Sequence, residues 1–251
     1  MKRAALAAIA GFALMGAGEP LLVPDVSQGE VQVRQGFTGT ELLLFGAILT
    51  PEGARAARDY DVVVVLEGPA RPMVLREKRK MAGIWVNADS ITLRSVPSFY
   101  AVASSRPLRD IVDERTAAIY ELGLGSLQLS PAEAVDEARQ NHFAAGLVEQ
   151  MGRKGLYRQD EHAVEITGQV LYKARIQLPS SVQTGTYTAE TFAIRKGRVV
   201  ASALAHVEVK KIGFEKAVAD HARHDGLLYG LLAVAVSVAM GWVAGRLFVR
   251  G

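Results

Sequence analysis

The chain contains no cysteine, which excludes disulfide bonds, thiolate metal sites and cysteine nucleophiles together. It also lacks the GxGxxG, Walker A, GxSxG and HExxH signatures of nucleotide-binding, hydrolase and zinc-protease sites. The sequence alone therefore identifies no catalytic residue, no metal site and no cofactor.

A concentrated positive face is missing as well, although the formal net charge is +3. All 26 acidic residues and 25 of the 29 basic ones lie between Glu19 and Asp225, so this middle segment is close to neutral. Only residues 76–80, Arg-Glu-Lys-Arg-Lys, form a local basic cluster. Because nucleic-acid binding needs a positive surface that displaces counterions, we expect no nucleic-acid partner.

Residues 1–18 have the parts of a secretory signal peptide. Lys2 and Arg3 precede an uncharged apolar stretch that ends in small residues at positions 16–18. The stretch is shorter than the ~20 residues that a membrane-crossing helix needs. This pattern predicts export, with an uncleaved anchor as the alternative.

The other end of the chain carries a second apolar segment. Residues 227–245 contain no charge, and Arg246 and Arg250 follow them. Tyr229 and Trp242 lie near its two ends, where aromatic rings settle at a bilayer interface. We expect a transmembrane helix over 226–246, in contact with the lipid bilayer; a buried helix of a soluble domain is the alternative.

These two ends define a topology. A juxtamembrane segment is expected at 211–225 and a short cytoplasmic tail at 247–251. The positive-inside rule then predicts a single-pass protein of the bacterial inner membrane, with its N-terminal domain in the periplasm and its C-terminus in the cytoplasm. Small residues recur on one face of the expected helix, a pattern that favours self-association or a membrane-protein partner, although such residues are common in membrane helices. They are Gly226, Gly230, Ala233, Ser237, Gly241 and Gly245.

Residues 19–210 are expected to form a mainly β periplasmic domain. Runs such as 41–49 and 61–67 have strand length and are flanked by Gly and Pro, and residues 171–178 alternate strictly. Tyr187 in Gly-Thr-Tyr-Thr resembles the tyrosine corner of immunoglobulin-like sandwiches. We predict an immunoglobulin-like β-sandwich with an inserted α-helical hairpin at about 107–155; two separate lobes are the alternative.

The helical insertion is predicted from caps and periodicity. Helices are expected over 107–122 and 131–152, joined by a turn at 123–126. Ser130 would cap the second helix, with Pro131 at its first position.

Several phrases resemble one known family. They are GTELLLFG at 39–46, DVVVVLEG at 61–68, GIWVN at 83–87 and VPSFYAVASSRP at 96–107. Together they are similar to the uncharacterised alphaproteobacterial transmembrane proteins of the Alph_Pro_TM family. The resemblance implies a membrane protein of unknown activity, with an accessory role beside a sulfite-exporter-type permease.

The family-like phrases also supply the candidate binding residues, in which aromatic rings lie beside polar groups. They are Trp85, Asn87, Phe99, Tyr100 and Arg106. The alternative is that the aromatic members belong to the core of the sandwich.

Three functional hypotheses follow. The first is a non-enzymatic binding or scaffolding module that is accessory to a membrane transporter. The second is a membrane-tethered periplasmic hydrolase whose site is assembled only by folding. The third is metal handling through His221 and His224, for which the sequence fixes no third ligand.

Overall fold

The computed structural model describes residues 20–33, 36–50, 59–168, 170–211 and 226–248. The expected signal peptide, residues 212–225 with both of their histidines, and residues 249–251 lie outside this part of the chain. Two compact units are distinguished, one of Met1–Val31 and Thr38–Val209, the other of Gln32–Phe37 and Lys210–Gly251.

One antiparallel sheet has four strands. In spatial order they are β1 (Leu21–Val26), β3 (Gly39–Leu49), β10 (Leu171–Pro179) and β9 (Val164–Thr167). Along β10 every second side chain is buried, beginning with Tyr172, as the alternating sequence predicts. The strands therefore present one apolar face.

The second sheet has six strands. In spatial order they are β2 (Glu30–Val33), β12 (Arg198–Lys211), β11 (Gly185–Arg195), β4 (Asp61–Glu67), β7 (Tyr100–Ser104) and β8 (Tyr157–Glu161). The valines and leucine of β4 are almost fully buried, because this strand lies in the middle of the sheet and is covered on both faces.

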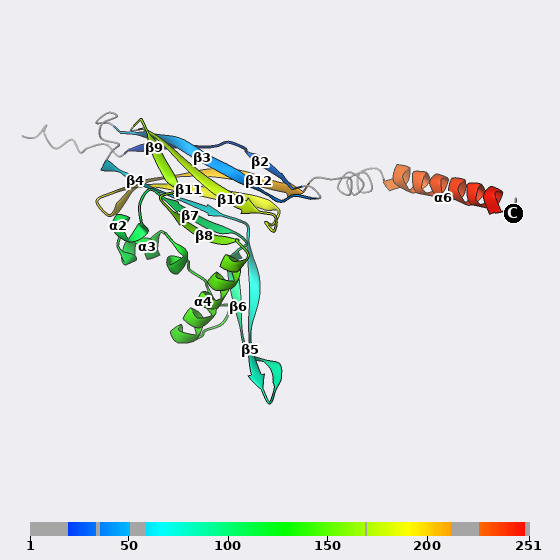
Figure 1. Cartoon of the computed structure of the whole chain (residues 1–251), viewed down its shortest axis with the longest axis horizontal. Coiled ribbons are helices and arrows are strands. Elements are labelled where there is room, and N and C mark those ends of the chain that lie inside the picture. The colour runs from blue at the N-terminus through cyan, green and yellow to red at the C-terminus, as the bar shows by residue number, and fades with distance from the viewer. Residues whose placement is uncertain (1–19, 34–35, 51–58, 169, 212–225, 249–251) are drawn as a thin grey trace, which may run out of the picture. The chain divides into compact units, whose positions relative to one another are not determined.

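The two sheets pack face to face, with the Tyr172 hydroxyl 3.3 Å from Thr191 Oγ1 across the interface (Figure 1). The order β1-β3-β10-β9 corresponds to strands A-B-E-D of an immunoglobulin-like sandwich, and β12-β11-β4-β7 to G-F-C-C′. The Tyr187 hydroxyl donates a hydrogen bond of 2.8 Å to the carbonyl of Gln183, so the predicted tyrosine corner is confirmed.

A long hairpin extends from the sandwich (Figure 1). It consists of β5 (Ala70–Met81) and β6 (Ile84–Pro97), joined by Ala82 and Gly83. Both turn residues have positive φ, 49° and 88°, as a two-residue type I′ turn requires. The chain therefore reverses within residues 73–87, and this segment supplies the ends of two paired strands.

The helical insertion differs from the predicted hairpin. It contains α2 (Leu108–Ile111), α3 (Glu114–Ile119), the 3₁₀ helix η3 (Leu124–Ser126) and α4 (Glu137–Arg153). The first predicted helix is divided because Asp113 caps a new helix by accepting from the Thr116 amide. Because β7 and β8 pair in parallel, the chain between them must form a crossover connection, and these helices make up that connection.

The second predicted helix begins later than expected. Pro131 forms a β-bridge with Leu93, and the Ala132 amide donates to the carbonyl of Thr92. Pairing with β6 therefore extends this segment, and α4 is capped by Asp136, which accepts from the Arg139 amide at 2.8 Å.

The prediction for the C-terminal segment needs a correction. Residues 226–248 form a helix, α6 (Gly226–Phe248). Within the described parts of the chain, however, no helix is both long and apolar enough to cross a membrane. The transmembrane helix expected over 226–246 is therefore not supported, and the fold class is corrected to a mainly β sandwich with helical insertions.

Candidate functional site

The β5–β6 hairpin, here called the arm, exposes large apolar side chains at its tip, residues 78–86. Met81, Ile84 and Trp85 are 57%, 65% and 68% exposed. Three such side chains next to one turn leave an apolar surface in water, and surfaces of this kind mark interaction sites. The tip is therefore the first candidate for a binding surface.

The strand register shows how the tip side chains are arranged. Met81 pairs with Ile84, and Lys80 pairs with Trp85. Side chains of directly paired residues share one face of a hairpin, and successive pairs alternate between faces. The tip consequently presents Met81 and Ile84 on one face and Trp85 on the other.

Positive charge surrounds these apolar residues. Arg76, Lys78, Arg79 and Lys80 are exposed, whereas Glu77 is the one carboxylate between positions 76 and 86. Glu77 lies 3.2 Å from Arg79 Nη2, which leaves most of the cationic charge uncompensated by this pair. The basic cluster noted in the sequence therefore lies directly beside the exposed apolar residues of the tip.

The base of the arm is held by α4. Arg139 donates from Nε and Nη2 to the two carboxylate oxygens of Asp89, at 3.0 and 2.6 Å, and also to the carbonyl of Ser90 at 2.7 Å. The Arg139 guanidinium lowers the pKa of the Asp89 carboxyl. Ile91 and Leu93 of β6 are buried, and Arg94 donates to the carbonyl of Ala132. The arm is thus anchored at its base and exposed at its tip.

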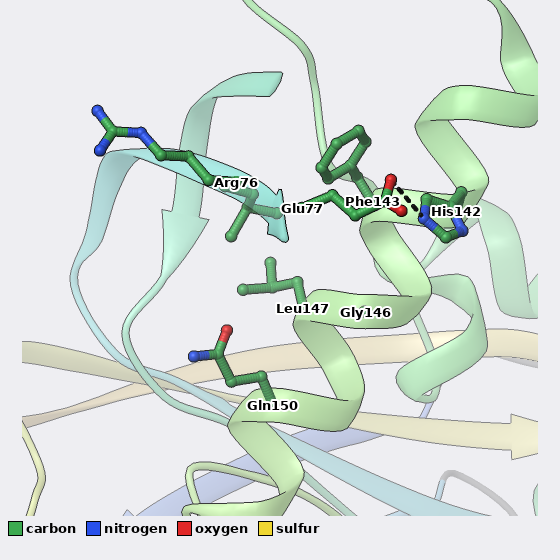
Figure 2. A pocket seen from close by; sticks show the side chains of 8 residues that line it. Arg76, Glu77, His142, Phe143, Gly146, Leu147 and Gln150 are labelled. Atoms are coloured by element: carbon green, nitrogen blue, oxygen red, sulfur yellow. Dashed lines mark ion pairs between the residues drawn. The ribbon is translucent and has the colours of Figure 1, made fainter. Parts of the chain in front are cut away.

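A notch of about 170 Å³ lies between β5 and α4 (Figure 2). Its lining residues are Leu75, Arg76, Glu77, His142, Phe143, Gly146, Leu147 and Gln150. In Figure 2 the side chains of Glu77 and His142 point toward each other, with His142 Nε2 3.4 Å from Glu77 Oε2.

The chemistry of the notch is limited by what lines it. The His142 imidazole and the Glu77 carboxylate could exchange a proton with a bound molecule. None of the lining residues carries a hydroxyl or a thiol, so an acyl intermediate of the serine or cysteine hydrolase type cannot form on them. The lining combines apolar side chains with polar ones, so it suits a small amphipathic group. The apolar residues are Leu75, Phe143 and Leu147, and the polar ones include Glu77 and His142.

The most strongly shifted titratable groups lie away from the arm tip. Burial raises the pKa of the Tyr100 and Tyr157 hydroxyls. Tyr157 donates to the carbonyl of Pro97 at 2.7 Å, and Tyr100 donates to the carbonyl of Glu121. Burial, followed by the charge of Glu121, raises the pKa of the nearby Glu67 carboxyl. The two tyrosines are neutral donors that tie loops to the sheet.

The structure separates the predicted binding residues. Trp85 and Asn87 lie on the arm and are exposed. Phe99 and Tyr100 are completely buried, so they belong to the core, the alternative that the sequence left open. Arg106 follows β7 and forms a bidentate ion pair with Asp61, at 2.7 and 2.5 Å. Only Trp85 and Asn87 are brought together.

Sequence reasoning missed part of the site. Met81 and Ile84 complete the tip with Trp85, but a hairpin turn was needed to place them together. The dipeptide Ala82-Gly83 was the available sequence signal for this turn. It predicts a two-residue hairpin turn less strongly than Asn-Gly or Asp-Gly does.

The small-residue stripe lies on α6. A Cβ added at Gly230, Gly241 or Gly245 would meet nothing within 4 Å. Its predicted role as a packing surface within a bilayer depended on the transmembrane assignment, which is not supported. In the described residues no group of three His, Asp or Glu side chains could hold a metal ion.

Comparison with known proteins identifies a family. Residues 21–250 match a family model described as "Putative transmembrane protein (Alph_Pro_TM)". No curated protein matches the chain. The match covers the arm, both sheets, the helical insertion and all of α6. The chain therefore belongs to the family that this model describes, Alph_Pro_TM, as its sequence phrases indicated.

Proposed function

We propose that the protein is a non-enzymatic binding module of a membrane-associated complex and that the arm is its contact element. The exposure of Met81, Ile84 and Trp85 together at the tip is the observation that carries this proposal. Trp and Arg are the residue types that most often dominate binding energy at interfaces, and the tip contains both.

The anchoring of the arm supports the same function. A binding residue contributes most when its position is fixed before the partner arrives. The Arg139–Asp89 pair and the buried residues of β6 hold the base of the arm, so less order has to be gained on binding.

The setting of the complex is part of the proposal. Family membership supports a membrane location. The signal-like residues 1–18 favour placing the module in the periplasm at the bacterial inner membrane. A membrane transporter, of the sulfite-exporter type that the resemblance implies, is the partner that we propose.

Site-specific cross-linking in native membranes tests the contact. A photoreactive amino acid would replace Trp85 in one full-length variant and Leu204 in a matched control. Leu204 is 56% exposed on β12, away from the arm. We expect a transporter adduct from position 85, identified by mass spectrometry, and none from position 204. Equal adducts from both positions, or none from position 85, would contradict the proposal.

A hydrolase is the second candidate, because His142 and Glu77 face each other across the notch. Water activated by this pair would be the nucleophile. Turnover of ester or phosphate model substrates that is lost in His142→Ala and Glu77→Gln, but kept in Trp85→Ser, would favour this candidate over the binding module.

A further inference from the structure

We propose that the arm tip docks onto the surface of an anionic lipid bilayer, with Met81, Ile84 and Trp85 at the interface and the neighbouring cations at the lipid phosphates. This inference goes beyond the proposed function, because it assigns the apolar and cationic side chains of the tip to the lipid surface itself rather than to a partner protein.

The distribution of apolar side chains favours a bilayer over a protein groove. Met81 and Ile84 lie on one face of the hairpin and Trp85 on the other. A groove on a partner covers one face of a hairpin well, whereas a lipid interface surrounds both faces of an inserted tip. Trp is also the side chain that concentrates at membrane interfaces, since its ring is apolar with one polar N–H.

The charge pattern determines the kind of lipid. Residues 76–80 carry four cations and one carboxylate, on the strand that leads to Met81. Asp89, the next carboxylate along β6, is paired with Arg139 and does not oppose this charge. Long Lys and Arg side chains can lie along the apolar surface while their charged ends reach phosphates. Attraction to an anionic surface strengthens binding about fivefold for each cation near it.

The backbone of the tip is suited to shallow insertion. Pairing continues without interruption from Lys78 opposite Asn87 to Met81 opposite Ile84, immediately before the turn. Most peptide groups near the tip therefore already have partners within the hairpin. This lowers the cost of leaving water, which is high for unpaired peptide groups.

The fluorescence of Trp85 provides a direct test. The chain has two tryptophans, so a full-length Trp242→Phe variant leaves Trp85 as the sole reporter. This variant would be dialysed from detergent into vesicles of acyl-chain-brominated phosphatidylcholine, either alone or mixed with phosphatidylglycerol. We expect a blue shift and bromine quenching in the anionic vesicles, with much less of both in neutral ones and at high salt.

A charge variant is the matched control. Lys78→Ser, Arg79→Ser and Lys80→Ser together should weaken docking on the order of 100-fold and abolish the quenching. Far-UV circular dichroism would establish that the fold is kept. Unquenched Trp85 in anionic vesicles that contain the protein, or equal quenching in neutral vesicles, would overturn the inference.

The two proposals fail in different ways. A transporter adduct at position 85 with Trp85 still exposed to water would refute lipid docking and leave the binding module in place. Quenching by anionic lipid without any protein adduct would support lipid docking and refute the transporter as the partner of the tip.

Discussion

Removal of a single hydroxyl from the tyrosine corner should measurably destabilise the sandwich. Tyr187 is completely buried on β11, and its hydroxyl donates to the carbonyl of Gln183 at 2.8 Å. Burial raises the pKa of this hydroxyl to about 12, so it remains a neutral donor at ordinary pH. In Tyr187→Phe the ring that packs on Phe99 is retained, and only the hydrogen bond is lost.

The magnitude follows from the acceptor that is left behind. A buried group without its partner costs roughly 1–3 kcal/mol, so we expect a loss of about 2 kcal/mol in the free energy of unfolding. For a domain of this size that corresponds to a decrease of about 4–8 °C in Tm. With an m-value of about 2 kcal/mol per molar urea, the urea midpoint should fall by about 1 M.

Urea unfolding of the full chain, followed by far-UV circular dichroism, is the assay. Tyr172→Phe is the matched control, since this tyrosine is equally buried but its contact with Thr191 Oγ1 is longer, 3.3 Å. We expect the control to lose less than about 1 kcal/mol. An unchanged midpoint in Tyr187→Phe, or a larger loss in Tyr172→Phe, would refute the reasoning.

Three further variants test other parts of the fold. Gly46→Ala should cost about 3 kcal/mol or more by thermal unfolding, because a Cβ there would overlap the carbonyl of Val23 and the Tyr172 hydroxyl; an unchanged Tm would contradict this packing. Gly146→Ala should raise stability by about 0.5–1 kcal/mol, since its Cβ would enter open space on a helix; a loss in urea unfolding would count against it. The pKa of Glu67 is raised above 4.5, so its stabilising contribution is complete below pH 4.5 and lost as the pH rises through the raised pKa. Glu67→Gln should therefore reduce this loss of stability with rising pH, and it should be more stable than the original protein at pH values above the raised pKa. Thermal unfolding measured at a series of pH values tests this, and an unchanged pH profile would contradict it.

The strands were predictable because their signal is local. Alternation along β10 and the continuous apolar run of β4 each follow from which faces are covered, and both can be read along the chain. The Gly-Thr-Tyr-Thr phrase was sufficient to place the tyrosine corner, because the hydroxyl reaches a carbonyl only a few residues upstream.

The helical insertion could not be read in the same way. Ser130-Pro131 has the composition of a helix start, but pairing with β6 is a contact over a long sequence separation. Such a contact overrides a local capping preference, and it cannot be predicted from the residues next to it in the sequence. The start of α4 at Glu137 is therefore set by tertiary contacts and not by the local sequence.

The sequence by itself determined the mainly β character, the near-neutral middle segment and the family resemblance, since each depends on residue types and their spacing. Only the tertiary structure decided which aromatic residues are available to a partner. Phe99 and Tyr100 are completely buried while Trp85 remains in water, although all three occur in similar aromatic-polar phrases. The physical reason is that burial depends on what packs against a residue from distant parts of the chain, and the Ala82-Gly83 turn carries Trp85 away from that packing.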